Sequence, residues 1–116
     1  MAYNIDIQTG IDYDVTFTWN DANGMPIDTS TFTAYMQVRE SPLSNNVFFD
    51  ASPFLIANSD ESINGAVRLK IPYFATQSLS ALNQGVYDIK LKSNTGDVYL
   101  LIDGLVNIKK TITEII

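Results

Sequence analysis

The sequence predicts an all-β protein in which antiparallel strands form two layers around one core. Three observations lead to this fold class. Side chains alternate between apolar and polar along several short runs, and a period of two indicates strands. Glycine, proline, asparagine and aspartate separate these runs, as they do at turns. Apolar residues make up 46% of the 116 residues, which is enough for one core, so we expect residues 1–116 to form a single domain.

The N-terminal part of the chain contains three alternating runs. Residues 3–8, with Ile5 and Ile7 on one face, are predicted as a short strand. Longer strands follow in residues 10–19 and 33–39, each with one apolar and one polar face. The residues expected to face the core are Tyr13, Val15, Phe17 and Trp19 in the first of these and Ala34, Met36 and Val38 in the second. Strands that are apolar on one side only are typical of an antiparallel sheet that is buried on one side.

Two connections interrupt this pattern. Residues 21–24 have the Asp, Asn and Gly of a tight turn, and residues 25–32 form a crossover that contains Pro26. Residues 41–65 are rich in Ser, Asn, Asp and Pro, which predicts irregular loop with one or two short edge strands. The aromatic residues of this connection are either an exposed contact patch or a plug at the mouth of the core; they are Phe48, Phe49 and Phe54.

The C-terminal half continues as strands around one short helical turn. Gly65 precedes a strand that ends at Pro72, and residues 73–82 have helical spacing. A strand over residues 86–93 and a turn at residues 94–97 then predict a hairpin. The returning strand is apolar on both faces over residues 98–102, which predicts that it is central or covered. The core-facing residues are expected to be Val67, Leu69, Ile71, Tyr87, Ile89 and Leu91, and Gly104 is expected to mark a β-bulge.

The end of the chain is apolar and prone to form a strand. An exposed strand of this kind tends to pair with the edge of another sheet. The residues that we expect to make such contacts are Ile112, Ile115 and Ile116.

The charge of the chain restricts its partners. The formal net charge is −6, which argues against nucleic acid as a partner. Residues 1–61 hold nine acids and one base, whereas residues 62–116 hold six bases and four acids. This split represents either ordinary solvated faces or an acidic side that meets the basic side of a neighbouring copy. The sequence has no apolar run of membrane-spanning length and no signal-peptide pattern, so we expect synthesis in a cytoplasm and no membrane partner.

The residue types needed for catalysis are scarce. The chain has no Cys and no His, which leaves no base-and-nucleophile pair and no common soft metal ligand. Asp12 and Asp14 share a strand face and could form an acid–base pair, but on a polar outer face such carboxylates usually serve solubility. We therefore expect no enzymatic activity, no cofactor, no metal and no small-molecule substrate.

The order of the motifs resembles one known family. Gly10-x-Asp12 is followed by Trp19-x-Asp21-x-x-Gly24-x-Pro26-Ile27-Asp28-x-Ser30-x-Phe32-Thr33-Ala34-x-Met36-x-Val38-Arg39. Asn64-Gly65, Leu79, Leu82, Gly85-Val86-Tyr87-Asp88-Ile89 and Asp103-Gly104-x-Val106-x-Ile108 complete it. Over nearly its whole length the chain resembles small β-sandwich proteins encoded among the structural genes of tailed bacteriophages, of the type found as the N-terminal domain of upper-baseplate proteins.

This resemblance implies an immunoglobulin-like antiparallel β-sandwich of about seven to eight strands with one short helical turn. It also implies a virion structural protein that is assembled in the host cytoplasm. Such a protein would dock in the tail, baseplate or neck region to other virion proteins, and we expect contacts with copies of itself. A capsid decoration or cement protein is an alternative. A carbohydrate-binding or adhesin-like module, with Trp19 or Tyr99 as stacking platform, is another.

Overall fold

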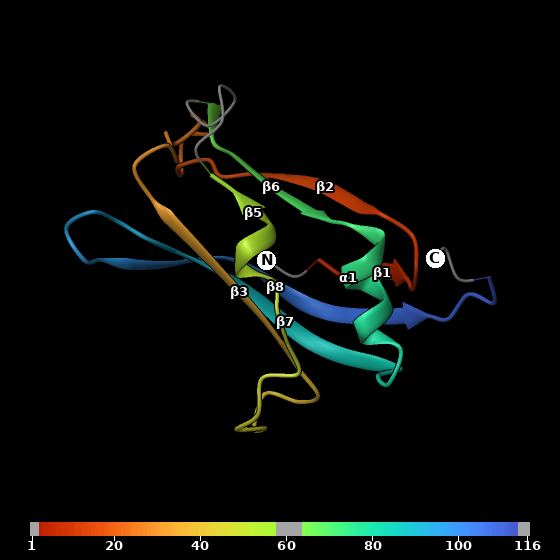
Figure 1. Ribbon diagram of the computed structural model, residues 1–116. Coiled ribbons are helices and arrows are strands. Elements are labelled where there is room, and N and C mark those ends of the chain that lie inside the picture. The colour runs from red at the N-terminus through yellow and green to blue at the C-terminus, as the bar shows by residue number, and fades with distance from the viewer. Residues whose placement is uncertain (1–2, 58–63, 114–116) are drawn as a thin grey trace.

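A computed structural model describes residues 3–57 and 64–113 of the chain. Within these residues the strands form two sheets that pack face to face (Figure 1). The five-stranded sheet has the order β1-β8-β7-β3-β4, and the three-stranded sheet has the order β2-β6-β5. The strands of the larger sheet are β1 (Ile5–Gln8), β8 (Val98–Lys109), β7 (Gln84–Lys92), β3 (Thr33–Arg39) and β4 (Phe49–Asp50). Those of the smaller sheet are β2 (Tyr13–Thr18), β6 (Ala66–Ile71) and β5 (Leu55–Ile56).

The predicted alternation of faces produces one core between the two sheets. Every pair of neighbouring strands is antiparallel except β1 and β8, which are parallel. Side chains from both layers are fully or almost fully buried between the sheets: Ile5, Ile7, Met36, Val38, Leu69, Ile71, Ile89 and Val106. The all-β sandwich that the sequence predicts is therefore confirmed.

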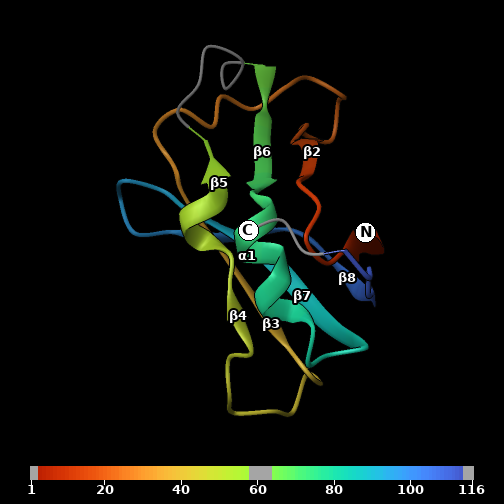
Figure 2. The ribbon, with the colours of Figure 1, turned by 45° about the vertical axis from the view of Figure 1, so that its right-hand side comes forward.

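One end of the sandwich is closed by the predicted helical turn. Helix α1 (Tyr73–Thr76) and the 3-10 turn Gln77–Leu79 connect β6 in one layer to β7 in the other, as Figures 1 and 2 show from two directions. Leu79 of this segment is fully buried. The backbone N–H of Tyr73 donates to the Asp12 carboxylate at 2.7 Å, and the Thr76 hydroxyl donates to the carbonyl of Ile11 at 3.0 Å. The turn is thus tied to the segment that leads into β2.

The long connection after β3 contains the short edge strands that its composition predicts. Strand β4 pairs with β3, the 3-10 turn Ser52–Phe54 follows, and β5 pairs with β6. The backbone N–H of Met36 donates to the Ser52 hydroxyl oxygen at 2.9 Å, which fixes the 3-10 turn against the larger sheet. The connection therefore crosses from one sheet to the other.

One expectation about β8 is wrong, and another is confirmed only in part. The register irregularity between β7 and β8 falls between Ile89 and Lys90, and Leu101 is the extra residue, so Gly104 does not mark the bulge. Glycine is needed at position 104 because a Cβ there would overlap the backbone of Tyr3. In the apolar segment 98–102, Ile102 is buried and Leu101 packs against the core, whereas Val98, Tyr99 and Leu100 are exposed. Strand β1 pairs with β8 only from Val106 onward, so among the described residues 98–100 form an open edge.

A cluster of tyrosines near the start of β1 predicts a pH dependence. The Tyr87 hydroxyl donates to the carbonyl of Tyr3 at 2.6 Å, and Tyr13 lies close to both residues. Burial first, and then the proximity of Tyr3 and Asp6, raises the pKa of Tyr13 from 10.0 to about 12. Burial raises the pKa of Tyr87 as well.

These shifts make the protein less stable in strong base. Above pH 10 an unfolded chain releases tyrosine protons that the folded chain retains, so stability falls as pH rises through the folded pKa. Because Tyr13 is half-exposed and solvent screens its neighbours, we expect it to contribute a loss of about 1 kcal/mol between about pH 10 and pH 12. Tyr13→Phe keeps the ring and should make the free energy of unfolding in urea less pH-dependent in this range. Equal pH dependence in the two proteins would contradict the assignment.

Candidate docking surface

The two carboxylates considered for catalysis have structural partners. Asp14 accepts hydrogen bonds from the Arg68 guanidinium, one of them at 2.8 Å from Nε, and these bonds lower the pKa of Asp14. Asp12 accepts the N–H of Tyr73 at the start of α1. Among residues 3–57 and 64–113 no group of three acidic, His or Cys side chains could hold a metal ion. In the same residues no helix has the length and hydropathy that crossing a membrane requires.

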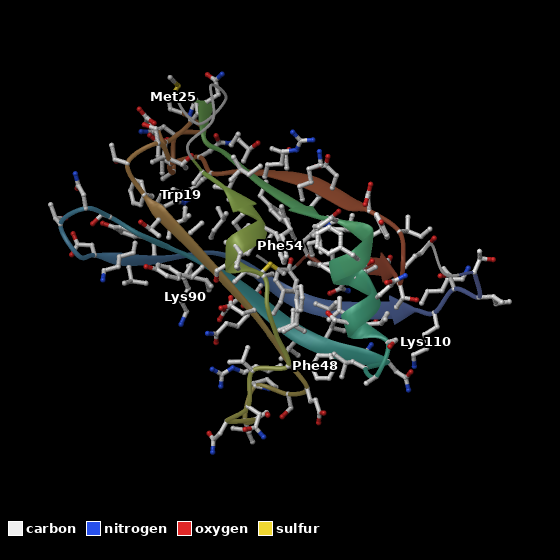
Figure 3. All side chains as sticks on the ribbon, in the orientation of Figure 1. Trp19, Met25, Phe48, Phe54, Lys90 and Lys110 are labelled. Carbon is white, nitrogen blue, oxygen red and sulfur yellow. The ribbon has the colours of Figure 1, made fainter. Side chains whose placement is uncertain are left out.

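The side of the five-stranded sheet that faces away from the core presents four rows of side chains, which we call the outer face. The register of β3, β7 and β8 defines these rows, because directly paired residues point to the same side of a sheet. In the order β3, β7, β8 they are Thr33, Lys92 and Val98; Tyr35, Lys90 and Leu100; Gln37, Asp88 and Asp103; and Arg39, Val86 and Leu105. Figure 3 shows Lys90 pointing away from the three-stranded sheet.

Large apolar side chains are exposed on this face. The exposed fractions are 58% for Val98, 54% for Leu100, 47% for Tyr35 and 39% for Leu105. Polar residues usually occupy the solvent side of an antiparallel sheet. An apolar group on that side, interleaved with charges, is typical of a surface that binds another protein.

A hollow of about 640 Å³ lies over the third and fourth rows. Its lining includes Asp88, Asp103, Val86 and Leu105, with Lys90 from the second row. Asp88 and Asp103 are direct cross-strand partners, an arrangement that places two negative charges side by side. Within the described residues the ion pair joins Arg68 and Asp14. Asp88 and Asp103 therefore take part in none there. Arg39 also lines the hollow, so two acids and two bases surround it.

The open edge of β8 adjoins this face. Tyr99 points to the inner side of the sheet, where its ring centroid lies 5.5 Å from that of Trp19 and 6.1 Å from that of Phe32. Trp19 and Phe32 also contact each other, with centroids 5.4 Å apart. The two residues predicted as alternative stacking platforms, Trp19 and Tyr99, thus belong to one aromatic group. Trp19 in this group is half-buried and Tyr99 is 43% exposed.

The aromatic residues predicted as contacts are half-buried. Phe48, Phe49 and Phe54 all pack against the core, and Phe49 and Phe54 stack with centroids 6.0 Å apart. Figure 3 shows Phe54 near the middle of the molecule and Phe48 toward the 41–47 loop. Their position agrees with the interpretation that they close the mouth of the core. Their role in docking remains a prediction.

The C-terminal contact residues are only partly within the described chain. Ile112 follows β8 and is 99% exposed, and β7 and β3 lie between β8 and β4 in the sheet. Ile115 and Ile116 lie outside the described residues. The structure therefore brings Phe49 and Phe54 together and leaves Ile112 apart from them.

Sequence reasoning missed the outer face because its rows join three strands. Exposed apolar residues at polar-face positions were the available signal, with Tyr35 in one strand and Val98 and Leu100 in another. Only the register places them beside one another and beside Lys90.

Comparison with known proteins identifies the fold. No protein-family model matches the chain, and no curated protein sequence matches it. Among solved structures, a chicken TCR is 11% identical, with a TM-score of 0.50, over 97% of this chain and 55% of that one. Murine CRIg is 10% identical, with a TM-score of 0.45, over 94% and 92% of the two chains. The SrpA adhesin R347E mutant of Streptococcus sanguinis is 14% identical, with a TM-score of 0.47, over 92% and 55%.

The class that these observations define is the immunoglobulin-like β-sandwich. The packing of two mainly antiparallel sheets, the sheet order and the likeness to the TCR agree on it. The chain spans about half the length of the TCR and adhesin chains. At these identities the likeness concerns the fold alone.

Proposed function

We propose that the chain is a non-enzymatic structural domain of a tailed-bacteriophage particle that docks to other virion proteins in the tail, baseplate or neck. The observation that carries this proposal is the ordered series of turn and core motifs from Gly10 to Ile108, which resembles small virion proteins over nearly the whole chain. An immunoglobulin-like sandwich agrees with the fold that the resemblance implies.

Surface features support docking rather than catalysis. The acids that could form a catalytic pair bind Arg68 and the N–H of Tyr73. The outer face, by contrast, exposes apolar residues beside charged ones, which suits contact with a protein.

Fractionation of purified phage particles tests the location. Mass spectrometry of separated tails and capsids should find the chain in the tail fraction at a stoichiometry of several copies. Recovery with capsids would instead support a decoration or cement protein and would contradict the tail location. Absence from both fractions would contradict the virion role itself.

A matched pair of variants tests the C-terminal contact. Ile112→Asp should lower the amount of chain incorporated into particles, by about tenfold, because a charge would replace an apolar contact that becomes desolvated on docking. Leu43→Asp is the control, because it makes the same kind of change in the 41–47 loop. Leu43 is 92% exposed and Ile112 is 99% exposed, so neither change should affect folding. Equal incorporation of both variants and the unaltered chain would remove Ile112 from the contact.

Carbohydrate binding is the second candidate, and the aromatic group of Trp19, Phe32 and Tyr99 favours it. Aromatic rings near an open edge can stack on sugars. Binding on a glycan array that disappears in Tyr99→Ala would support this function. An array without any binding would contradict it.

A further inference from the structure

We propose that the outer face of the five-stranded sheet binds a second copy of this chain, with Lys90 of each copy against Asp88 of the other. This inference names the surface and the partner, and it does not depend on the virion role. The evidence for the dimer is the distribution of charged and apolar side chains over the four rows.

The charges divide the face into two halves along β7. Lys92 and Lys90 lie in the first and second rows, and Asp88 lies in the third with Asp103 beside it. Consider a two-fold axis that is parallel to the sheet and perpendicular to its strands, and that passes between the second and third rows. This axis would place the second row of one copy opposite the third row of the other. Each Lys90 would then face Asp88 of the second copy, and the contact would occur twice because such an interface is isologous.

One pair of apolar residues obeys the same symmetry, whereas Leu100 would lie opposite Asp103 and Val86 opposite Lys92. Val98 in the first row and Leu105 in the fourth lie on β8, on either side of the proposed axis. The axis would therefore place Val98 of one copy opposite Leu105 of the other, and both residues are exposed in the single chain. Apolar contact on β8 would thus occur on both sides of the Lys90–Asp88 pairs.

The hollow fits the lysine that this arrangement brings to it. Asp88 and Asp103 line the hollow together with Lys90 and Arg39 of the same chain, and neither carboxylate forms an ion pair within the described chain. A lysine from a second copy would compensate the repulsion between these two paired acids.

The charge of the whole molecule favours this face over the others for self-association. The chain carries a formal net charge of −6, and its copies repel one another. The four rows, however, hold three bases (Arg39, Lys90 and Lys92) and two acids (Asp88 and Asp103), and Asp50 of β4 extends the third row beside Gln37, so this face has no excess of acids. Acidic residues such as Asp12 and Asp14 lie at the other sheet or in loops. Copies that meet through the outer face therefore keep most of their acids apart.

Complementary charge reversal tests the pairing. Sedimentation velocity of the full chain over a range of concentrations should show a monomer–dimer equilibrium. Lys90→Asp and Asp88→Lys should each raise the dimer dissociation constant by about tenfold or more, because each variant opposes like charges twice. An equimolar mixture of the two variants should form a heterodimer again, because every pair is then of opposite sign.

Controls separate this effect from altered net charge or folding. Lys109→Asp changes the net charge as Lys90→Asp does, at an exposed position beyond the four rows, and should leave the dimer intact. Circular dichroism confirms that each variant is folded. A chain that stays monomeric, equal effects of Lys90→Asp and Lys109→Asp, or a mixture that does not associate would each overturn the proposal. A dimer found in a chain that is absent from phage particles would leave this proposal standing and remove the proposed function.

Discussion

Ile89→Ala should lower the free energy of unfolding by about 2–5 kcal/mol, the range for truncating a large buried aliphatic side chain. Ile89 is 0% exposed at the middle of β7, where it is paired with Met36 on one side and Ile102 on the other. Its removal leaves a cavity between the layers that three hydrogen-bonded strands cannot easily close. Domains of this size are stable by about 5–15 kcal/mol, so the loss is a large part of the total.

Urea denaturation monitored by fluorescence measures this effect, and Thr16→Ala provides the control. Thr16 lies at an exposed position of β2 and should change the free energy of unfolding by less than about 0.5 kcal/mol. If Ile89→Ala were as mild as Thr16→Ala, the single core between the two sheets would be wrong.

Gly65→Ala is expected to cost about 2–3 kcal/mol. Gly65 has a φ of 83°, a left-handed conformation that costs a residue with a Cβ about 1–2 kcal/mol. A Cβ would also overlap the carbonyl oxygen of Trp19, so the two backbones must separate. That movement breaks the 2.9 Å hydrogen bond from the Trp19 N–H to the Gly65 carbonyl, which adds about 1 kcal/mol.

Gly24→Ala separates the two contributions. Gly24 has a similar φ of 80°, but no atom of the described residues lies within 4 Å of the position that a Cβ would take there, so only the conformational cost of about 1 kcal/mol applies. The melting temperature of Gly65→Ala should therefore be well below that of Gly24→Ala. Equal melting temperatures would show that the end of β2 does not meet the turn before β6 as described.

The alternation of apolar and polar residues predicts most of the fold, because a strand that is buried on one side has an apolar residue at every second position. The expected inward residues of β2, β3, β6 and β7 all lie on the side that faces the core. The helical turn predicted within residues 73–82 is present, since α1 with its 3-10 extension covers Tyr73–Leu79. Alternation cannot say which strands are neighbours. For this reason the sequence pattern predicts a central or covered strand at residues 98–102, whereas the structure buries Ile102 and leaves residues 98–100 exposed.

The candidate contact residues are predicted less completely, because alternation does not show which strands and loops are neighbours. Exposure of Ile112 could be inferred from its position after the last strand. Phe48, Phe49 and Phe54 could not be assigned, because an aromatic residue in a loop can pack inward or outward, and here all three pack against the core. The outer face depends on contacts between β3, β7 and β8, and pairing of this kind is absent from any single run of residues.

Cryo-electron microscopy of an intact tailed particle that encodes this chain tests the central claim most directly, that the sandwich acts by surface docking in a virion. Density for the two-layered domain is expected in the tail, baseplate or neck, where contacts of its outer surface hold it to neighbouring subunits. A map of the complete particle in which no density fits the domain would contradict it.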